Sequence, residues 1–405
     1  MRRVIRTKPC IPSSDTTWIK VAWDDILTTG NFIQGKYVKL LEERFAEYCG
    51  TKYAIATSSG ASALEVAIRA VILDENYLIL QSNILRSLGP PSDNYIIVQS
   101  NTFPASVNSI IRAGCRPLIS DIDPHTLSIS YKIFLDIVKA NSRIGAIMLV
   151  HMAGLINPDY DKIKNYCDEH GIMIIEDASH AVGSKIHNIS TGNLGDVGCF
   201  SLFATKIITS GEGGIITTND DNIYKRALIL RNHGCVRNAG ELEGVDYGVT
   251  CTDATSNFRM PELSAVIGAS QVPHIDEFVD HRNMISDFYM SHFKSDKFKG
   301  RIITPFEKLD IRQSWWQYII QLPDNTRLNR DEICNKLFTE FGIETANAYY
   351  PPCHAQPAYK EFGYGSNSNK FSGCEVLKKH IALPMHSTMS IDDALYVINS
   401  LDKLI

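Results

Sequence analysis

The chain has 405 residues, a net charge of −5, and 44% hydrophobic and 21% charged residues, which is ordinary for a globular protein. This composition excludes disordered and fibrous classes, and the acidic balance argues against a nucleic-acid-binding protein, which would carry a basic excess. The length favours one large and one smaller domain.

The N-terminus does not predict a secretory leader, because its arginines are followed by no apolar run. The longest apolar stretch, residues 146–156, is interrupted by His151 and is too short to cross a bilayer, which takes about 20 residues. Ten cysteines without a Cys-x-x-Cys pair indicate free thiols in a reducing compartment. We therefore expect a cytoplasmic protein without a membrane partner.

From residue 53 to residue 219, short runs rich in β-branched residues alternate with helix-length segments. The predicted strands are residues 53–56, 96–98, 117–119, 146–150, 172–175 and 215–217, and the clearest helices are 131–140 and 159–170. Such strands are typical of a sheet covered on both faces. The pattern predicts an α/β domain with a mostly parallel sheet flanked by helices and ligands at the carboxyl ends of the strands.

Beyond residue 271 the alternation loosens. A long helix at 276–293, a strand at 318–320 and a helix at 330–341 predict a smaller α+β domain.

We divide the chain into an N-terminal arm, 1–20, a large domain, 21–270, and a small C-terminal domain, 271–405. The stretches 74–94 and 235–255 are predicted to be loops or insertions near the surface.

Small residues at 57–63 follow the first predicted strand and open a helix, with the sequence Thr-Ser-Ser-Gly-Ala-Ser-Ala. Such a loop leaves backbone N–H groups unpaired, which suits a phosphate group. A tight strand-to-helix turn with a serine cap explains the pattern equally well. No Gly-Lys-Ser/Thr follows, so this is not a Walker loop.

Two acids, Glu176 and Asp177, lie at the end of a predicted buried strand, where a carboxylate needs a cation, a metal or several donors. A protonated pyridine nitrogen is such a cation, and its pairing with a carboxylate makes the ring an electron sink. The alternative is an acid that caps the next helix.

Lys206 follows the apolar, aromatic-rich stretch 195–205 and precedes the glycine-rich residues 210–214. An ammonium in that setting loses hydration, which lowers its pKa and suits formation of a Schiff base. A lysine on a solvated loop is the simpler alternative, but the flanking segments favour the first interpretation.

Three motifs occur in order: Glu-Asp-Ala-x-His at 176–180, Gly-Asp-x-Gly-Cys-Phe-Ser-x-Phe-x-x-Lys at 195–206, and Asn-x-Arg-Met at 257–260. Together they resemble the sugar aminotransferases of the DegT/StrS type, fold type I enzymes that use pyridoxal 5′-phosphate (PLP). The resemblance extends from about Trp18 to the C-terminus and includes residues 27–35 and 350–354. Each motif is weak alone, and their combination is specific.

The resemblance implies that Lys206 forms the Schiff base with PLP and then moves protons between the cofactor and the substrate. It implies that Asp177 holds the pyridinium proton and that His180 meets the phenolic oxygen of the ring. A satisfied buried imidazole remains the alternative for His180.

The resemblance also implies that Phe103 stacks on the ring and that Gly60, Ala61 and Ser201 cradle the phosphate. Many members have threonine where this chain has Ala61, which leaves the phosphate to backbone N–H groups. Asn257 resembles the asparagine that reaches the phosphate of a neighbouring subunit, which implies a homodimer with shared active sites. A core role for Phe103 and a capping role for Asn257 remain alternatives, and no metal is expected.

The activity that the resemblance implies is transfer of an amino group, by a ping-pong mechanism, from an amino acid, expected to be glutamate, to a keto group of a nucleotide-linked sugar. Residues 207–214 resemble members that act on 4-keto-6-deoxy sugars more than those that act on 3-keto sugars, which favours C4. The alternatives are a PLP-dependent sugar dehydratase, a class that replaces the lysine with histidine, and a PLP-binding regulatory or sensing protein without turnover. A plain α/β binding module without PLP is a further one.

Overall fold

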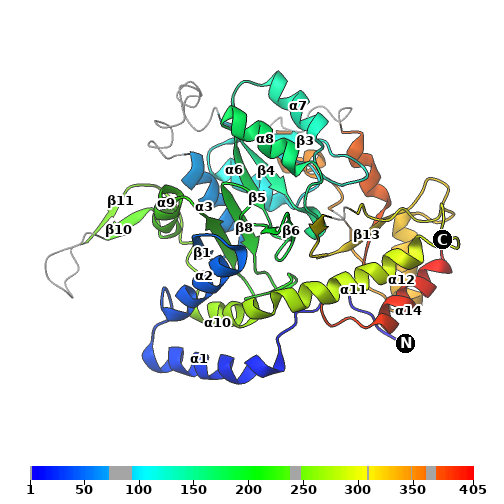
Figure 1. Ribbon diagram of the computed structural model, residues 1–405, viewed down its shortest axis with the longest axis horizontal. Helices are drawn as coiled ribbons and strands as arrows, with labels where there is room; N and C mark the ends of the chain where they lie inside the picture. The colour runs from blue at the N-terminus through cyan, green and yellow to red at the C-terminus, as the bar shows by residue number, and fades with distance from the viewer. Residues whose placement is uncertain (1, 73–93, 238–247, 308–309, 348, 362–370) are drawn as a thin grey trace.

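The computed structural model describes residues 2–72, 94–237, 248–307, 310–347, 349–361 and 371–405. A seven-stranded sheet lies at its centre, with helices on both faces (Figure 1). In spatial order its strands are β1 (Tyr53–Thr57), β9 (Gly214–Thr218), β8 (Val197–Ser201), β5 (Met173–Asp177), β4 (Ile144–Val150), β2 (Tyr95–Gln99) and β3 (Arg116–Ser120). β9 runs antiparallel to both neighbours, and the other adjacent pairs are parallel. The predicted mostly parallel α/β sheet is confirmed.

Two helical layers bury the faces of this sheet. One layer, packed on the apolar residues of β2, β4, β5 and β8, consists of α3 (Gly60–Ile72), α6 (Pro104–Arg112) and α9 (Asp221–Arg231). The opposite layer consists of α7 (Tyr131–Ala140), α8 (Tyr160–His170), α2 (Lys36–Cys49) and α10 (Glu262–Gln271). Both faces are therefore apolar, as the near-continuous hydrophobic strands predict.

β5 shows how strand alternation sorts side chains between the two layers. Met173 and Ile175 pack in the core beneath α3 and α6, whereas Ile174 packs in the core beside α8. Because successive side chains point to opposite faces, Asp177 continues the first row and Glu176 the second. The two acids at the end of this strand therefore face different surroundings.

A smaller unit packs beside the sheet. β13 (Tyr318–Gln321) pairs antiparallel with β14 (His380–Leu383), and α12 (Arg330–Phe341) and α14 (Ile391–Asp402) cover the pair. Capping boxes at Asn329 and Ser390 begin these two helices. The short α13 spans Pro357–Glu361.

The long helix α11 (Ile275–Phe293) belongs to both cores. Its first turns, with Ile275 and Val279, pack in the core of the large unit, whereas Tyr289 and Phe293 pack in the core of the small unit. The proposed boundary at residues 270 and 271 falls just before this helix, and the division into domains remains a prediction.

The N-terminal residues cross the molecule to the small unit. Val4 is buried, donates its N–H to the carbonyl of Gly342 at 3.0 Å and accepts from the N–H of Glu344 at 2.9 Å. The chain then reaches α1 (Thr16–Thr29) beneath α10 (Figure 1). The first residues of the proposed arm are therefore anchored to the small unit.

Two remaining ladders lie outside the main sheet. β12 (Ile311–Arg312), β6 (Lys185–Ile186) and β7 (Ile189–Ser190) form a three-stranded sheet. β10 (Cys235–Arg237) pairs with β11 (Val249–Cys251) in a hairpin. The expectation of a loop at 235–255 is therefore wrong at these strands, where β-branched Val236, Val249 and Thr250 favour extended backbone.

The other predicted loop, 74–94, lies outside the described residues except for the buried Asn94. No helix in the described ranges combines the length and the apolar character that a membrane span requires.

Candidate active site

A cavity of about 500 Å³ opens at the carboxyl ends of the parallel strands. Its walls come from the ends of β5 and β8, the first turns of α3 and α6, residues 316, 317, 346, 347 and 349, and Arg6 of the N-terminal segment. Seven of the eight predicted site residues line it, namely Gly60, Ala61, Phe103, Asp177, His180, Ser201 and Lys206. Segments far apart in the sequence thus meet in one place, at the edge where α/β sheets bind ligands.

Lys206 lies on the loop between β8 and β9. Leu202 anchors both sides of this loop, because its N–H donates to Gly213 at 2.8 Å and its carbonyl accepts from the N–H of Ser210 at 2.9 Å. The Nζ of Lys206 lies 4.3 Å from the ring centroid of Trp316. Loss of hydration lowers the pKa of Lys206 to about 7, against a smaller opposing effect of Asp177. An amine with that pKa is a nucleophile and a base at neutral pH.

Asp177 ends β5 and presents its carboxylate to the cavity. Its Oδ2 accepts from the hydroxyl of Ser106 at 2.6 Å, and its Oδ1 accepts from the N–H of Ser179 at 3.2 Å. A carboxylate has about four acceptor positions, so these two donors leave capacity on the side that faces the cavity. Among the described residues no cation forms an ion pair with Asp177, although the side chain is buried.

The neighbouring Glu176 is enclosed on the opposite face of β5. Its two oxygens accept from the N–H groups of Gly192, Leu194 and Gly195 at 2.8 to 2.9 Å and from Nε2 of His151 at 3.0 Å. With four donors and no exposed surface, Glu176 is fully satisfied by the protein.

His180 forms part of the cavity wall beside Trp316. Its imidazole stacks on the indole with ring centroids 3.8 Å apart, and its Nε2 lies 3.0 Å from the hydroxyl of Tyr349. Burial, helped by the positive charge of Lys206, holds the pKa of His180 well below its usual value. The ring is therefore neutral at physiological pH and offers one donor and one acceptor.

The first turn of α3 forms one end of the cavity. The hydroxyl and N–H groups of Ser59 and Ser62 bond to each other, with each N–H donating to the other hydroxyl at 2.8 and 3.1 Å. The N–H groups of Gly60 and Ala61 have no partner inside the helix, as expected at a helix N-terminus. A Cβ at Gly60 would lie 2.7 Å from the Cβ of Ser201, so only glycine allows this close approach. These N–H groups and the Ser201 hydroxyl can hold a phosphate.

Phe103 lies just before α6 and leaves 55% of its surface exposed, although it is a large apolar side chain. Its ring borders the cavity and lies 5.7 Å from that of Tyr349. The alternative of a core phenylalanine does not fit this exposure, which leaves a ring face available for a planar ligand.

Sequence reasoning missed cavity residues from distant parts of the chain, among them Arg6, Trp316, Asn347 and Tyr349. Trp316 and Tyr349 contact Lys206 and His180, respectively, while Arg6 and Asn347 line the wall. The local sequence gave no reason to place residues from the N-terminal segment and from beyond residue 300 beside Lys206, because only the fold brings them there.

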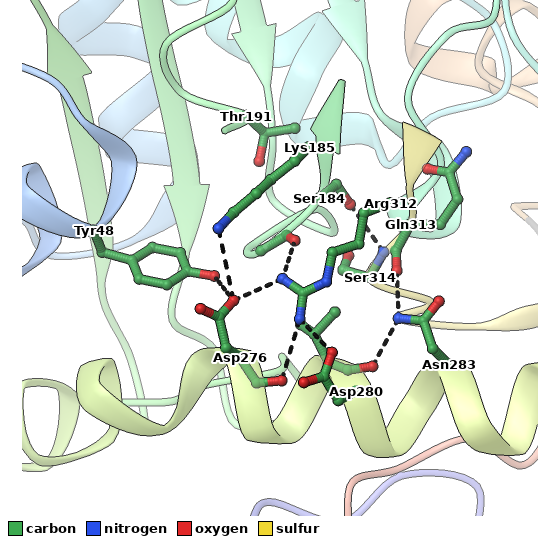
Figure 2. A network of polar contacts seen from close by, with 12 residues as sticks. Tyr48, Ser184, Lys185, Thr191, Asp276, Asp280, Asn283, Arg312, Gln313 and Ser314 are labelled. Carbon is green, nitrogen blue, oxygen red and sulfur yellow. Dashed lines mark hydrogen bonds and ion pairs between the residues drawn. The ribbon is translucent and has the colours of Figure 1, made fainter. Parts of the chain in front are cut away.

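Charged contacts hold the segment that carries Trp316 against α11, as Figure 2 shows. Arg312 lies between Asp276 and Asp280 of α11, with one guanidinium nitrogen 2.6 Å from each carboxylate. The hydroxyl of Tyr48 donates to Asp276 at 2.8 Å, and Lys185 approaches the same carboxylate at 3.8 Å. Side chains from three other parts of the chain are thereby tied to one helix.

The residues after Arg312 form further hydrogen bonds that connect this segment to the cavity wall. Ser314 donates its N–H to Ser184 at 3.0 Å and its hydroxyl to the carbonyl of His180 at 3.3 Å. The indole N–H of Trp316 donates to the carbonyl of Thr205, next to Lys206, at 2.8 Å. The wall formed by His180 and Trp316 is thus fixed from both sides.

Residues 15–402 match the profile of the DegT/DnrJ/EryC1/StrS aminotransferase family. The chain belongs to this family. It is 31% identical over 396 residues to the GDP-perosamine synthase of Caulobacter vibrioides, a span that covers 96% of this chain and 93% of the relative. The predicted family and aminotransferase activity are confirmed.

Two solved structures share the fold. PseC of Helicobacter pylori, an aminotransferase involved in the biosynthesis of pseudoaminic acid, matches with a TM-score of 0.83 at 22% identity, over 100% of this chain and 99% of that one. The PLP-form of Spr1654 from Streptococcus pneumoniae matches with a TM-score of 0.82 at 23% identity, over 100% and 98% of the chains. The predicted fold class and PLP cofactor are confirmed.

The cavity of this family member fits PLP by its own chemistry. Asp177 offers unused acceptor capacity to a pyridinium, Lys206 offers an amine of lowered pKa to an aldehyde, and α3 offers free N–H groups to a phosphate. The assignment of single residues to these contacts remains a prediction that the geometry supports.

Asn257 lies apart from the other predicted residues. It is exposed outside the cavity, its Oδ1 accepts from the N–H of Arg259 at 3.1 Å, and its backbone pairs with Asn232. Asn257 does not line the cavity of its own subunit, and the prediction that it serves a neighbouring subunit stays open.

Proposed function

We propose that this aminotransferase moves an amino group from glutamate to the keto group of a nucleotide-linked sugar, with C4 of the sugar as the favoured position. The observation that carries the proposal is the pairing, across one cavity, of an amine whose pKa is about 7 with a buried carboxylate that lacks a full set of donors. The sugar substrate is supported by similarity to a GDP-perosamine synthase. The preference for C4 rests on residues 207–214.

When bound, PLP supplies the electron sink that makes the carbon bearing the amino group acidic. The Nζ of Lys206 removes and returns the proton on that carbon, because its lowered pKa lets the amine serve as both base and acid near neutral pH. The carboxylate of Asp177 would hold positive charge on the ring nitrogen of the bound cofactor, and Ser106 fixes the orientation of that carboxylate.

The remaining walls orient the reactants and exclude water. Phe103 would cover one face of the bound ring, and His180, held by Trp316 and Tyr349, would offer a hydrogen bond to the ring oxygen. A single cavity of about 500 Å³ must receive both donor and acceptor, which supports their binding in turn. The order of events is therefore ping-pong, with release of the oxo acid before the sugar binds.

Arg6 gives the cavity a cation for anionic substrates. Arg6 lines the wall, and its charge acts on Tyr349. Burial raises the pKa of Tyr349, and the charge of Arg6 opposes that effect. Among the described residues no carboxylate forms an ion pair with Arg6. Arg6 is thus available for a carboxylate of glutamate or for the phosphates of the nucleotide.

The working form in this proposal is a cytoplasmic homodimer with shared sites. Large apolar side chains lie exposed along α1 and just after it, and a second copy would cover them: Val21, Leu27, Phe32 and Ile33. Asn257 is exposed as a contact with a partner requires. Light scattering coupled to gel filtration should give twice the mass of one chain; the mass of a single chain would contradict shared sites.

The decisive experiment presents the purified enzyme and PLP with glutamate and a set of 3-keto and 4-keto nucleotide sugars, followed by mass. We expect an amino sugar from a 4-keto substrate. Amination of a 3-keto sugar alone would overturn the C4 assignment. If the enzyme releases 2-oxoglutarate but aminates none of the sugars, only the half-reaction with glutamate is supported and the sugar substrate is contradicted. If it reacts with no amino acid, the alternative of a regulatory or sensing protein is favoured.

A further inference from the structure

The hairpin of β10 and β11 extends from the body of the protein between α9 and the segment that leads to Asn257 (Figure 1). Its register places Cys235 directly opposite Cys251. The next pair of opposed residues, Gly234 and Thr252, is hydrogen-bonded, because the N–H of Thr252 donates to the carbonyl of Gly234 at 2.8 Å. Since the two kinds of pair alternate along an antiparallel ladder, Cys235 and Cys251 form a non-hydrogen-bonded pair.

This kind of pair suits a bond between the two side chains. Directly opposed residues project to the same face of the ladder, and the Cα atoms of a non-hydrogen-bonded pair lie about 4.5 Å apart. A disulfide requires about 4.4 to 6.8 Å between Cα atoms. Both thiols also meet at one point, because each Sγ lies 3.6 Å from the carbonyl oxygen of His233.

We propose that Cys235 and Cys251 are a reversible redox site that forms an intrachain disulfide with glutathione disulfide as the oxidant. One thiolate attacks the oxidant and releases one glutathione thiol, and the second thiolate then attacks the mixed disulfide and releases the other. One S–S bond breaks in the oxidant and one forms in the hairpin. The two cysteines lose two electrons and two protons, which reappear in two glutathione thiols. This site is independent of the proposed transamination.

The surroundings single out this pair among the ten cysteines. Six are buried, and Cys10 and Cys334 are half-buried on separate elements, whereas Cys251 is exposed and Cys235 is half-buried. Partial burial, together with a hydrogen bond to Cys251, raises the pKa of Cys235. Less thiolate is therefore present at neutral pH, and the rate of oxidation should increase with pH.

The disulfide would join the two ends of the hairpin at its base. Asn232 pairs with Asn257 just beyond this point, and Arg259 donates to the side chain of Asn232. The cross-link therefore fixes the strand that leads into the Asn257 segment, and oxidation should protect the hairpin from opening.

The sequence makes the test direct. Trypsin cleaves after Arg231, Arg237 and Arg259, so Cys235 and Cys251 fall in separate peptides, 232–237 and 238–259, each with a single cysteine. The full-length protein is incubated with glutathione disulfide at pH 7 and pH 8, alkylated, digested and analysed by mass. We expect the two peptides to be linked, the linkage to form about tenfold faster at pH 8, and dithiothreitol to reverse it.

Matched variants complete the experiment. Cys235→Ser and Cys251→Ser should each abolish the linked peptides, whereas Cys334→Ser, at another half-buried thiol, should leave them unchanged. Separate glutathione adducts on both peptides, without linkage in the unmodified protein, would overturn the proposal. Linkage found only in a covalent dimer on a non-reducing gel would also overturn it, because the bond would then join two chains.

Discussion

Glu176 and Asp177 are neighbours on one strand with the same charge, yet the two faces of the sheet treat them in opposite ways. On the closed face, three backbone N–H groups and His151 occupy both oxygens of Glu176. On the open face, Ser106 and Ser179 supply the two donors to Asp177, and the cavity borders the rest of the carboxylate.

This difference shows how the motif at residues 176–180 supplies one acid that stabilises the fold and one that can bind a ligand. A buried carboxylate with all its acceptor positions filled stabilises the fold, because the protein replaces the lost hydration. A buried carboxylate with positions to spare keeps a demand for positive charge, which a ligand can meet. Alternation along β5 alone assigns Glu176 and Asp177 to these two roles.

The largest effect should come from the lysine on the open face. Lys206→Ala removes a nucleophile and a base together, so turnover with glutamate and a keto sugar should fall by roughly a thousandfold or more. Noncovalent binding of PLP should persist, because the other contacts remain. Lys162→Ala, at an exposed lysine on α8, serves as control and should keep full activity. Near-normal turnover of the Lys206 variant would remove this lysine from the mechanism.

Asp177→Asn separates chemistry from stability. The amide cannot hold a proton on the ring nitrogen, so kcat should fall by roughly a hundredfold. The free energy of unfolding, measured with urea, should change by less than about 1 kcal/mol, because the amide oxygen can still accept from the N–H of Ser179 while the amide NH₂ donates to the hydroxyl of Ser106, which can also accept. If stability falls as far as activity does, Asp177 is a structural acid like its neighbour.

Glu176→Gln should show the reverse. The amide NH₂ would face N–H donors in a closed pocket, and the free energy of unfolding should fall by about 3 kcal/mol. The kcat of the protein that remains folded should stay within about twofold, since Glu176 does not border the cavity. Urea unfolding and active-site-normalised kinetics of both variants, compared side by side, test the contrast.

The pH dependence of PLP attachment tests the lowered pKa of Lys206 on the open face. An amine must be neutral to attack an aldehyde, so covalent attachment of PLP to the apoenzyme should rise with a midpoint near pH 7 and then level off. The charge of Asp177 raises the pKa of Lys206, so Asp177→Asn should move the midpoint lower and Glu176→Gln should leave it in place. A midpoint near the ordinary value for lysine would show that the amine is hydrated. Borohydride trapping followed by mass measures the attached fraction.

The smallest effect should come from Ser106→Ala. This change removes one neutral donor from Asp177, worth about 1 kcal/mol, so kcat should fall by about fivefold. Ser109→Ala, whose hydroxyl donates to a backbone carbonyl of the same helix, is a matched control. Equal losses in both variants would point to damage to α6 and would exclude a specific effect on the carboxylate.

Sequence patterns predicted most of the elements that carry the site. Residues 131–140 and 330–341 form helices with the expected bounds, and each predicted strand of the large unit overlaps an observed one, although the strand predicted at 172–175 begins at Met173. These segments were predictable because their apolar residues recur with the spacing of a helix or form the short continuous runs of a buried strand. The antiparallel direction of β9 was not, since parallel and antiparallel strands buried on both faces have the same apolar composition.

The residues of the candidate site likewise fall into a group that could be predicted from the sequence and a group that could not. Lys206, Asp177 and Gly60 belong to short local motifs whose chemistry can be recognised in the chain itself. Trp316 and Arg6 cannot, because their role depends on packing between residues that are hundreds of positions apart. The ladder at Cys235 and Cys251 was also missed, since residues 238–247 separate two strands of three residues each.

The N-terminal strand segment has a practical consequence for anyone who produces this enzyme. The backbone of Val4 pairs with that of Ile343, and Arg6, two residues later, lines the cavity. Trimming by a protease as far as residue 6 would remove Arg6 from the cavity wall, so it should lower the activity. At the other terminus Ile405 is partly accessible and does not line the cavity, so a handle placed there should leave the cavity intact.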